Sequence, residues 1–330
     1  MSASDVVQRR NLEKLYREMG EEIHKAMQDP SIVEVILNED GIVWVDRLGV
    51  GMSELCTLDP TAAVQMLGTI AHMLGRVINE KRPVIEGELP GDGSRVMGVI
   101  PPVVESPVFN IRKKASAVFP LDAYVKGGRL TTDDHTILTA AVLARENILI
   151  VGGTGTGKTT FANAILHEVW LQCSTHRAVI LEDSVELQCA LKNKVKMRTK
   201  PKVDPDDIEI TMQDLLKIAM RQKPDRIILG EVRGKEALDM VKAWNTGHPG
   251  GLCTVHANDA RAGLIRIEQL IAESGALPMR EFIAEVINIA VFLVRDPVIG
   301  PKVMEIVRIE GVINGEYVFK DVRTNEVLSH

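Results

Sequence analysis

Apolar residues recur at two different spacings in the first 120 residues of the chain. Alternating positions in SIVEVIL and IVWV, separated by Asp40-Gly41, predict a β-hairpin. Asp59 before Pro60 predicts the cap and the first turn of a helix. Helical spacing also predicts an amphipathic helix over the first 28 residues, with an apolar stripe of Leu12, Leu15, Met19, Ile23 and Met27.

A stretch rich in proline and glycine follows, and it contains two short strand-like runs, Arg95–Ile100 and Val108–Ile111. The helices, the hairpin and these short strands together predict a small α+β domain over residues 1–120. Residues 121–131 include Gly127-Gly128 and are expected to form a linker, because adjacent glycines interrupt regular structure.

From Thr132 onward, helical patterns alternate with short apolar runs rich in β-branched residues. Such runs are typical of strands in a buried parallel sheet, and helices between them indicate βαβ units. Near the C-terminus, Asn314-Gly315 separates MEIVRI from EYVF and predicts a hairpin. Residues 132–330 are therefore predicted to form an α/β domain, with strands at Ile148–Val151, Ala178–Leu181 and Ile227–Leu229.

The composition is that of an ordinary soluble globular protein, and the length suits two domains. Of the 330 residues, 45% are hydrophobic and 25% are charged. The net charge of −6 disfavours a global attraction to nucleic acid. The longest strongly apolar stretch, Ile287–Val294, is too short to span a bilayer, and we see no signal peptide. We therefore expect a cytoplasmic protein whose membrane contacts, where they exist, are peripheral.

The cysteines are too far apart to form a CxxC pair, which disfavours a zinc site or a dithiol redox site. We interpret them as small buried thiols in a reducing compartment. They are Cys56, Cys173, Cys189 and Cys253.

The sequence GGTGTGKTT, which starts at Gly152, lies between a predicted strand and a predicted helix. Glycines let successive backbone N–H groups point at phosphate oxygens, and the helix adds its positive dipole end. Lys158 would reach the β- and γ-phosphates, and the Thr159 hydroxyl would bind Mg²⁺. We therefore predict ATP and Mg²⁺ as ligands, bound by Gly153, Thr154, Gly155, Thr156, Gly157, Lys158, Thr159 and Thr160.

Acidic residues follow two of the predicted strands. Glu182 and Asp183 come after AVIL, and Glu231 comes after RIIL and a glycine. ATP hydrolysis needs one carboxylate near the metal and another that orients or deprotonates water. We assign the metal to Glu182 or Asp183, and we prefer Glu231 as the base, with Glu182 as the alternative. His248 and His256 lie in TGHPGGLCTVHAN and could sense the γ-phosphate, although a lone histidine is more often structural.

Four ordered segments resemble the Walker A, Asp-box, Walker B and His-box motifs of the type II/IV secretion ATPase superfamily. They are GGTGTGKTT, ILEDSVEL, KPDRIILGEVRG and TGHPGGLCTVHAN. GDGSRVMGVIPPV and FNIRKKA resemble the N-terminal domain of that superfamily. The resemblance extends over nearly the whole chain and favours the branch that powers type IV secretion. It implies a RecA-like P-loop ATPase domain, a hexameric ring and a nucleotide held between the two domains.

The resemblance also implies roles for single residues. Glu182 and Asp183 would be the Asp-box acids, Glu231 the Walker B glutamate and His256 the His-box histidine. Two arginines of the N-terminal domain, Arg95 and Arg112, would close over the nucleotide. Pilus-extension ATPases carry a four-cysteine zinc module, and the cysteine spacing of this chain cannot build one, which favours the secretion or retraction branches.

The function that we expect is an ATP-hydrolysing hexameric motor of a conjugation-type (type IV) secretion system. Its partners would be inner-membrane components of the channel, met at the inner face of the bacterial inner membrane. A pilus retraction motor with the same core is the alternative. A nucleic-acid motor is disfavoured by the acidic charge and by the lack of interleaved aromatic and basic residues. The intact acids disfavour a scaffold that does not hydrolyse ATP.

Six cations alternate with other residues just after the Asp-box. In an extended strand this period places all six on one face, which we call the basic strip. It is either an edge strand kept soluble by its charges or a contact for anionic lipid headgroups or an acidic partner. The strip consists of Lys192, Lys194, Lys196, Arg198, Lys200 and Lys202.

Overall fold

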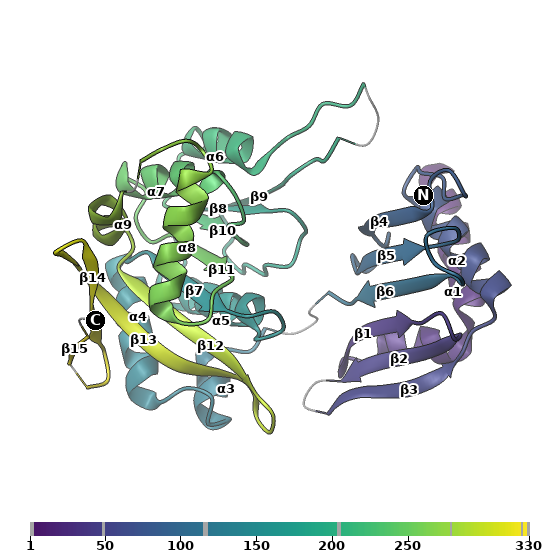
Figure 1. Ribbon diagram of the computed structural model, residues 1–330, viewed down its shortest axis with the longest axis horizontal. Coiled ribbons are helices and arrows are strands. Elements are labelled where there is room, and N and C mark those ends of the chain that lie inside the picture. Colours follow the sequence, from purple (N-terminus) through teal and green to yellow (C-terminus); the bar gives the residue numbers. More distant parts are fainter. Residues whose placement is uncertain are drawn as a thin grey trace. The chain divides into compact units, whose positions relative to one another are not determined.

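A computed structural model describes residues 3–47, 50–114, 118–202, 206–277, 279–324 and 326–328. The chain divides into two compact units, Met1–Ser116 and Ala117–His330, and each is described here by itself (Figure 1).

The first unit packs two helices, α1 (Ala3–Gln28) and α2 (Pro60–Met73), on one face of a six-stranded antiparallel sheet. The strand order is β3-β2-β1-β6-β5-β4, so the predicted N-terminal hairpin, β1 and β2, lies in one half of the sheet. The strands are β1 (Ile32–Leu37), β2 (Ile42–Arg47), β3 (Gly51–Thr57), β4 (Val84–Glu88), β5 (Arg95–Val99) and β6 (Val108–Arg112).

Alternation along the strands separates the two faces of this sheet. Val35, Val45 and Ile111 are fully buried against the helices, while their sequence neighbours point to the opposite face. The helix start predicted at Asp59 is also confirmed, since the Asp59 side chain accepts hydrogen bonds from backbone N–H groups of the first turn of α2. The hydrophobic pattern thus fixes which face of each element enters the core.

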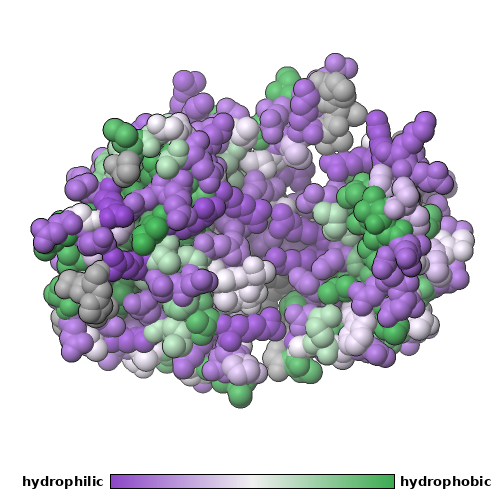
Figure 2. All heavy atoms as spheres, in the orientation of Figure 1, coloured by the Kyte–Doolittle hydropathy of each residue, from purple (hydrophilic) through white to green (hydrophobic). Residues whose placement is uncertain are grey.

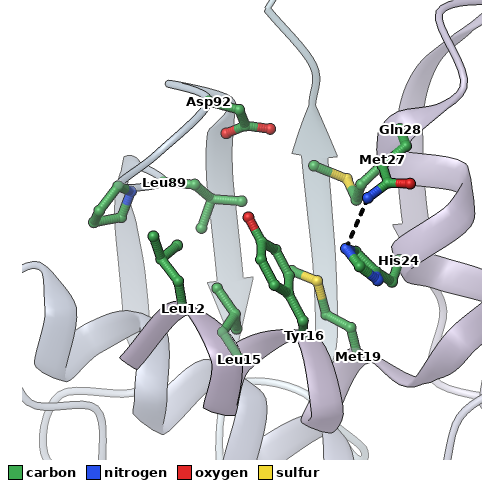
Figure 3. Close-up of a pocket in the computed structure, with 10 residues that line it drawn as sticks. Leu12, Leu15, Tyr16, Met19, His24, Met27, Gln28, Leu89 and Asp92 are labelled. Atoms are coloured by element: carbon green, nitrogen blue, oxygen red, sulfur yellow. Dashed lines mark hydrogen bonds between the residues drawn. The ribbon is translucent and has the colours of Figure 1, made fainter. Parts of the chain in front are cut away.

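Helix α1 is interrupted at Gly20, where φ is 76° and ψ is 168°. Tyr16 and His24 stack across this break with their ring centroids 4.3 Å apart. A small, largely apolar pocket opens beside the break, with Leu89 on its far wall (Figure 3). A glycine tolerates the positive φ at little cost, so the sequence permits a bend within a continuous helical pattern.

The second unit is a nine-stranded mixed sheet covered by helices on both faces. The order β15-β14-β13-β12-β7-β11-β10-β8-β9 is parallel from β12 to β9, and antiparallel hairpins extend it beyond β12. The predicted C-terminal hairpin is β13 with β14. The strands are β7 (Ile148–Gly152), β8 (Ala178–Glu182), β9 (Lys194–Arg198), β10 (Arg226–Leu229), β11 (Leu252–Val255), β12 (Ile289–Asp296), β13 (Gly300–Ile313), β14 (Glu316–Asp321) and β15 (Val327–Leu328).

Two hydrophobic clusters hold the helices to this sheet. One face packs against α3, α4 and α5, and the other packs against α6, α7, α8 and α9. The helices are α3 (Leu121–Lys126), α4 (Thr132–Ala144), α5 (Lys158–Gln172), α6 (Met212–Met220), α7 (Glu236–Asn245), α8 (Ala260–Ala272) and α9 (Arg280–Val286).

Residues 121–131 differ from the expected linker. Leu121, Tyr124 and Leu130 are buried in the same cluster as α4 and α5, and the segment contains helix α3. Thr131 then caps α4 through a reciprocal pair of hydrogen bonds with Asp134. The adjacent glycines mark the end of α3, and the buried apolar side chains around them keep the segment on the second unit.

The central part of the basic strip lies on β9, the edge strand of the large sheet. Its central cations, Lys194, Lys196 and Arg198, share one side of the strand, as their spacing predicts. Two members have acidic neighbours: Lys196 lies 3.9 Å from Glu182, and Lys200 lies 3.1 Å from Asp207. This arrangement favours the interpretation that the cations protect an exposed sheet edge.

Mostly hydrophilic side chains cover the surface that faces the viewer in Figure 2. Among the described residues, no helix combines the length and the apolar character that crossing a bilayer requires.

Candidate functional site

The predicted motifs meet at one edge of the large sheet. Strands β7, β8, β10 and β11 run parallel, so the residues that follow them lie at a common carboxyl edge. Lys158 follows β7, Asp183 follows β8, Glu231 follows β10 and His256 follows β11. Contacts of His256 connect Lys158 to Glu231, and contacts of Arg233 connect Glu231 to Asp183.

The loop between β7 and α5 has the geometry of a phosphate cradle. Gly155 and Gly157 have φ values of 72° and 85°, which non-glycine residues rarely adopt. The Thr156 hydroxyl donates to the Gly153 carbonyl at 2.9 Å and closes the loop. Helix α5 begins directly afterwards, so its free N–H groups are available to an anion. The loop therefore fits the phosphates of a nucleotide.

Lys158 is largely buried at the base of this loop. Its ammonium group donates to the carbonyl oxygens of Gly152 and Gly153 at 3.0 and 2.9 Å. The same nitrogen lies 3.3 Å from Nδ1 and 3.4 Å from Nε2 of His256, which places it almost equally far from both ring nitrogens. A phosphate entering the loop would offer this cation a charged partner in place of neutral ones.

His256 stands between Lys158 and Glu231. Its Nε2 is 3.0 Å from Oε1 of Glu231, a close approach that lacks hydrogen-bond alignment. Burial lowers the pKa of His256, the Lys158 charge lowers it further, and the Glu231 carboxylate opposes both effects. The neutral imidazole is therefore favoured, and it can exchange contacts with either neighbour.

Glu231 is mostly buried and uses its two carboxylate oxygens differently. Oε2 accepts a hydrogen bond from Nη2 of Arg233 at 2.6 Å. Oε1 is buried and has no hydrogen-bond partner among the described residues. An unsatisfied buried carboxylate oxygen is costly, so this atom is a natural acceptor for a water molecule or a ligand.

Glu182 has a different environment from the other predicted acids. It is 3% exposed, and its Oε1 accepts the backbone N–H groups of Glu186 and Leu187 at 2.8 and 2.6 Å. Burial raises the pKa of Glu182, while the two backbone hydrogen bonds and Lys196 act in the opposite direction. The carboxylate thus holds the loop that follows β8, which favours Glu231 over Glu182 as the base.

Asp183 points outward, with 40% of its side chain exposed. It accepts a hydrogen bond from the Thr199 hydroxyl at 2.9 Å. Proteins usually bind Mg²⁺ through one or two carboxylates together with substrate phosphates. Thr159 in the first turn of α5 and Asp183 fit that pattern. Oε1 of Glu182 does not, because it already accepts two backbone hydrogen bonds. The described residues contain no ready-made cluster of three metal-binding side chains.

The two arginines of the first unit are neighbours in its sheet. Arg95 on β5 pairs directly with Arg112 on β6, and Arg112 pairs with Glu34 on β1. Nε of Arg112 lies 4.0 Å from the Glu34 carboxylate, and 51% of the Arg112 side chain is exposed. The sheet therefore presents two adjacent cations on one face, next to an acid.

His248 does not join the site. Its Nδ1 lies 3.1 Å from the carbonyl oxygen of Pro224, just before β10 begins. This is the amino end of the parallel strands, opposite to the edge that carries Glu231. The structural interpretation of His248 therefore fits its position, and only His256 of the predicted pair lies among the other motif residues.

The sequence marked Arg233 only as a cation two positions after Glu231. Sequence patterns missed two further residues beside the site. Arg295 and Pro301 approach the phosphate loop from the β12–β13 hairpin, and no motif marks them. A β-carbon added to Gly157 would lie 2.7 Å from Pro301, and one added to Gly155 would lie 3.7 Å from Nη1 of Arg295.

Comparison with known proteins gives one family match over most of the chain. The sequence model of the family described as "Type II/IV secretion system protein" matches residues 18–296. A probable conjugal transfer protein TrbB from Sinorhizobium fredii is 44% identical over 308 residues, which cover 93% of this chain and 92% of that protein. Both matches confirm the family resemblance that the four sequence motifs predict.

Two solved structures share the fold. The Legionella pneumophila ATPase DotB aligns with a TM-score of 0.62 and 18% identity, covering 86% of this chain and 78% of DotB. The pilus retraction motor PilT, solved with bound ADP, aligns with a TM-score of 0.57 and 18% identity, covering 93% of this chain and 82% of PilT. Together with the two sheets, they confirm the predicted fold class, a RecA-like P-loop domain with a smaller N-terminal α+β domain.

Proposed function

Because this chain belongs to the type II/IV secretion system protein family, we propose that it is an ATP-hydrolysing motor of a conjugation-type (type IV) secretion system. The observation that carries the proposal is the meeting of Lys158, Asp183, Glu231 and His256 beside a phosphate loop. The similarity to a conjugal transfer protein over nearly its full length supports the choice of system.

Each residue of the site has a chemical role in this proposal. The backbone N–H groups of residues 153–160 surround the phosphates, and Lys158 exchanges its carbonyl partners for the β- and γ-phosphates. Thr159 and Asp183 would hold Mg²⁺, which when bound neutralises charge on the transferred phosphoryl group. Glu231 orients the attacking water and accepts its proton. Removal of Mg²⁺ with EDTA is expected to abolish turnover.

Glu231→Gln tests the proposed base. The amide keeps the size of the side chain and cannot accept the proton, so turnover is expected to fall by about a hundredfold or more. Nucleotide affinity, followed with a fluorescent ATP analogue, is expected to remain within about threefold, because Glu231 contacts water and not phosphate in this mechanism. Normal ATP turnover in the Glu231→Gln variant would reject the assignment.

We also propose that Arg95 and Arg112 close over the bound nucleotide. A fixed cation near the γ-phosphate lowers the barrier to phosphoryl transfer, and hydrolysis would then release the first unit and produce movement. Arg112→Ala is expected to reduce turnover much more than stability, since a half-exposed arginine supports little of the fold. Small-angle scattering with a non-hydrolysable ATP analogue should show compaction in wild type and less in the variant.

Two outcomes would contradict this closure. One is unchanged turnover in Arg95→Ala, in Arg112→Ala and in the double variant. The other is equal compaction of wild type and variant with the analogue. Either result would leave the first unit with a role in assembly only.

We propose a homohexamer as the working assembly, with inner-membrane channel components as partners. It would stand in the cytoplasm, peripheral to the inner face of the bacterial inner membrane. Native mass spectrometry with and without ATP tests the subunit number, and a population that remains monomeric in both states would contradict the ring. No sequence-specific nucleic-acid binding is expected, and filter binding with single-stranded DNA tests that expectation.

The second candidate function is a pilus retraction motor. The structural similarity to PilT supports this alternative only at the level of the fold, because the two sequences are 18% identical. The higher identity to a conjugal transfer protein favours secretion. Co-purification with the other ATPases of a conjugation channel would support the secretion motor, and co-purification with a pilus platform protein would support the alternative.

A further inference from the structure

The guanidinium of Arg233 joins the acids that follow two different strands. Its Nη2 donates to Oε2 of Glu231 at 2.6 Å, and its Nη1 lies 4.0 Å from Oδ2 of Asp183. These acids follow β10 and β8, which are neighbours in the sheet. One side chain thus spans the proposed base and the proposed metal ligand.

The backbone that carries Arg233 is fixed by other contacts. The N–H groups of Arg233 and Gly234 donate to Oε1 of Glu236 at 2.8 and 2.9 Å. Glu236 is the first residue of α7, so the loop after β10 is anchored to the helix. The position of the loop therefore does not depend on the Arg233 side chain, and its removal should leave the loop in place.

Arg233 also decides which oxygen of Glu231 remains available. The guanidinium engages Oε2, so Oε1 is the oxygen that can accept a proton or a water hydrogen bond without competing with Arg233. That atom is buried, lies 3.0 Å from His256 and has no hydrogen-bond partner in the part of the chain that the structure describes. A carboxylate held through one oxygen presents the other in a fixed direction, which is what a general base requires.

We propose that Arg233 is a positioning residue for Glu231: it holds Oε2 and aims Oε1 at the place of the attacking water. The proposal rests on the proposed function, because it takes Glu231 as the base. Arg233 acts through Glu231, so it should affect the chemical step and not nucleotide affinity. The Arg233 side chain is half exposed and contributes little to stability, so variants at this position should fold.

The test compares Arg233→Gln and Arg233→Lys in the full chain. Arg233→Gln is expected to lower kcat about tenfold to a hundredfold while KM for ATP changes less than about threefold. Arg233→Lys keeps a cation but not the fork geometry, so it should restore part of the rate. The matched control is Lys235→Gln, an exposed cation two positions further on, which should leave both constants unchanged.

A double-variant cycle separates this role from an independent one. If Arg233 works only through Glu231, adding Arg233→Gln to Glu231→Gln should not reduce the residual rate further, as measured with radiolabelled ATP. Multiplied losses in the double variant would overturn the proposal, and so would a rise in KM with kcat unchanged, which would mark Arg233 as a phosphate contact.

The same set of variants distinguishes the role of Glu231 as the base from the positioning role of Arg233. If Glu231→Gln alone turns over ATP normally, the base assignment fails and the positioning role fails with it. If Glu231→Gln is inactive and Arg233→Gln is as active as wild type, the proposed function stands and only the role of Arg233 is rejected.

Discussion

Replacement of Glu182 tests whether this acid serves the loop after β8 or the chemistry. Its buried Oε1 accepts the backbone N–H groups of Glu186 and Leu187. Glu182→Ala removes both partners at once. Glu182→Gln keeps an oxygen of similar position and removes only the charge, so the pair of variants separates loss of the acceptor from loss of the carboxylate.

The structure gives the size of the expected loss. A buried N–H group left without a partner costs about 1–3 kcal/mol. Leu187 is fully buried and Glu186 is half-buried, so the two losses together amount to about 2–4 kcal/mol of the free energy of unfolding. For a unit of this size the melting temperature should fall on the order of 10 °C. Glu182→Gln should lose about half as much, because hydrogen bonds to a charged acceptor are roughly twice as strong as neutral ones.

Thermal denaturation followed by circular dichroism measures the loss, and ATP turnover is assayed well below the melting temperature. Glu182→Gln is expected to retain most of its turnover. A Glu182→Gln variant that melts like wild type and hydrolyses ATP at least about a hundredfold more slowly would refute the reasoning, because that result is expected of a base.

Three further predictions follow from contacts in the two units. Lys158→Ala should reduce turnover by at least about a hundredfold in a coupled ATPase assay while the far-ultraviolet spectrum stays unchanged. Gly251→Ala should lower the free energy of unfolding, measured by urea denaturation, by at least about 2 kcal/mol, because its β-carbon would lie 2.0 Å from the Trp244 indole. The control, Gly68→Ala, has open space around it in α2 and should stabilise the protein. Because the cations of an edge strand such as β9 protect it from pairing with other strands, removing them should not change binding to lipid. Wild type and a triple glutamine variant of the basic strip should therefore float equally with anionic liposomes. The changes in that variant are Lys192→Gln, Lys194→Gln and Lys202→Gln.

The residues that meet at the sheet edge could be placed from sequence because each comes within a few residues of the end of a buried strand. Lys158, Glu231 and His256 come after short runs that are apolar on both faces, and parallel strands bring such positions together. The period of the hydrophobic pattern and the direction of the strands are therefore enough to gather these side chains without any knowledge of the contacts between them.

The contacts that these side chains make could not be predicted from the sequence in the same way. Glu182 and Asp183 are adjacent in sequence, yet one carboxylate is buried on backbone N–H groups and the other faces outward. Alternation along β8 turns them to opposite sides, and which side carries a loop depends on tertiary structure. The segment at 121–131 differed from the predicted linker for a related reason. Its glycines can be recognised in the sequence, whereas the burial of Leu121 and Tyr124 depends on residues elsewhere in the core.

Residues of the β12–β13 hairpin, which come late in the sequence, line the phosphate loop. Leu293 pairs with Gly152 at the end of β7, and Pro301 lies against Gly157, where a β-carbon would meet it at 2.7 Å. A ribosome has synthesised the whole motif long before it reaches either hairpin residue. The phosphate loop of the nascent chain would therefore be incomplete, and it would bind nucleotide only after β12 and β13 had docked. ATP binding would then report that the second unit has finished folding.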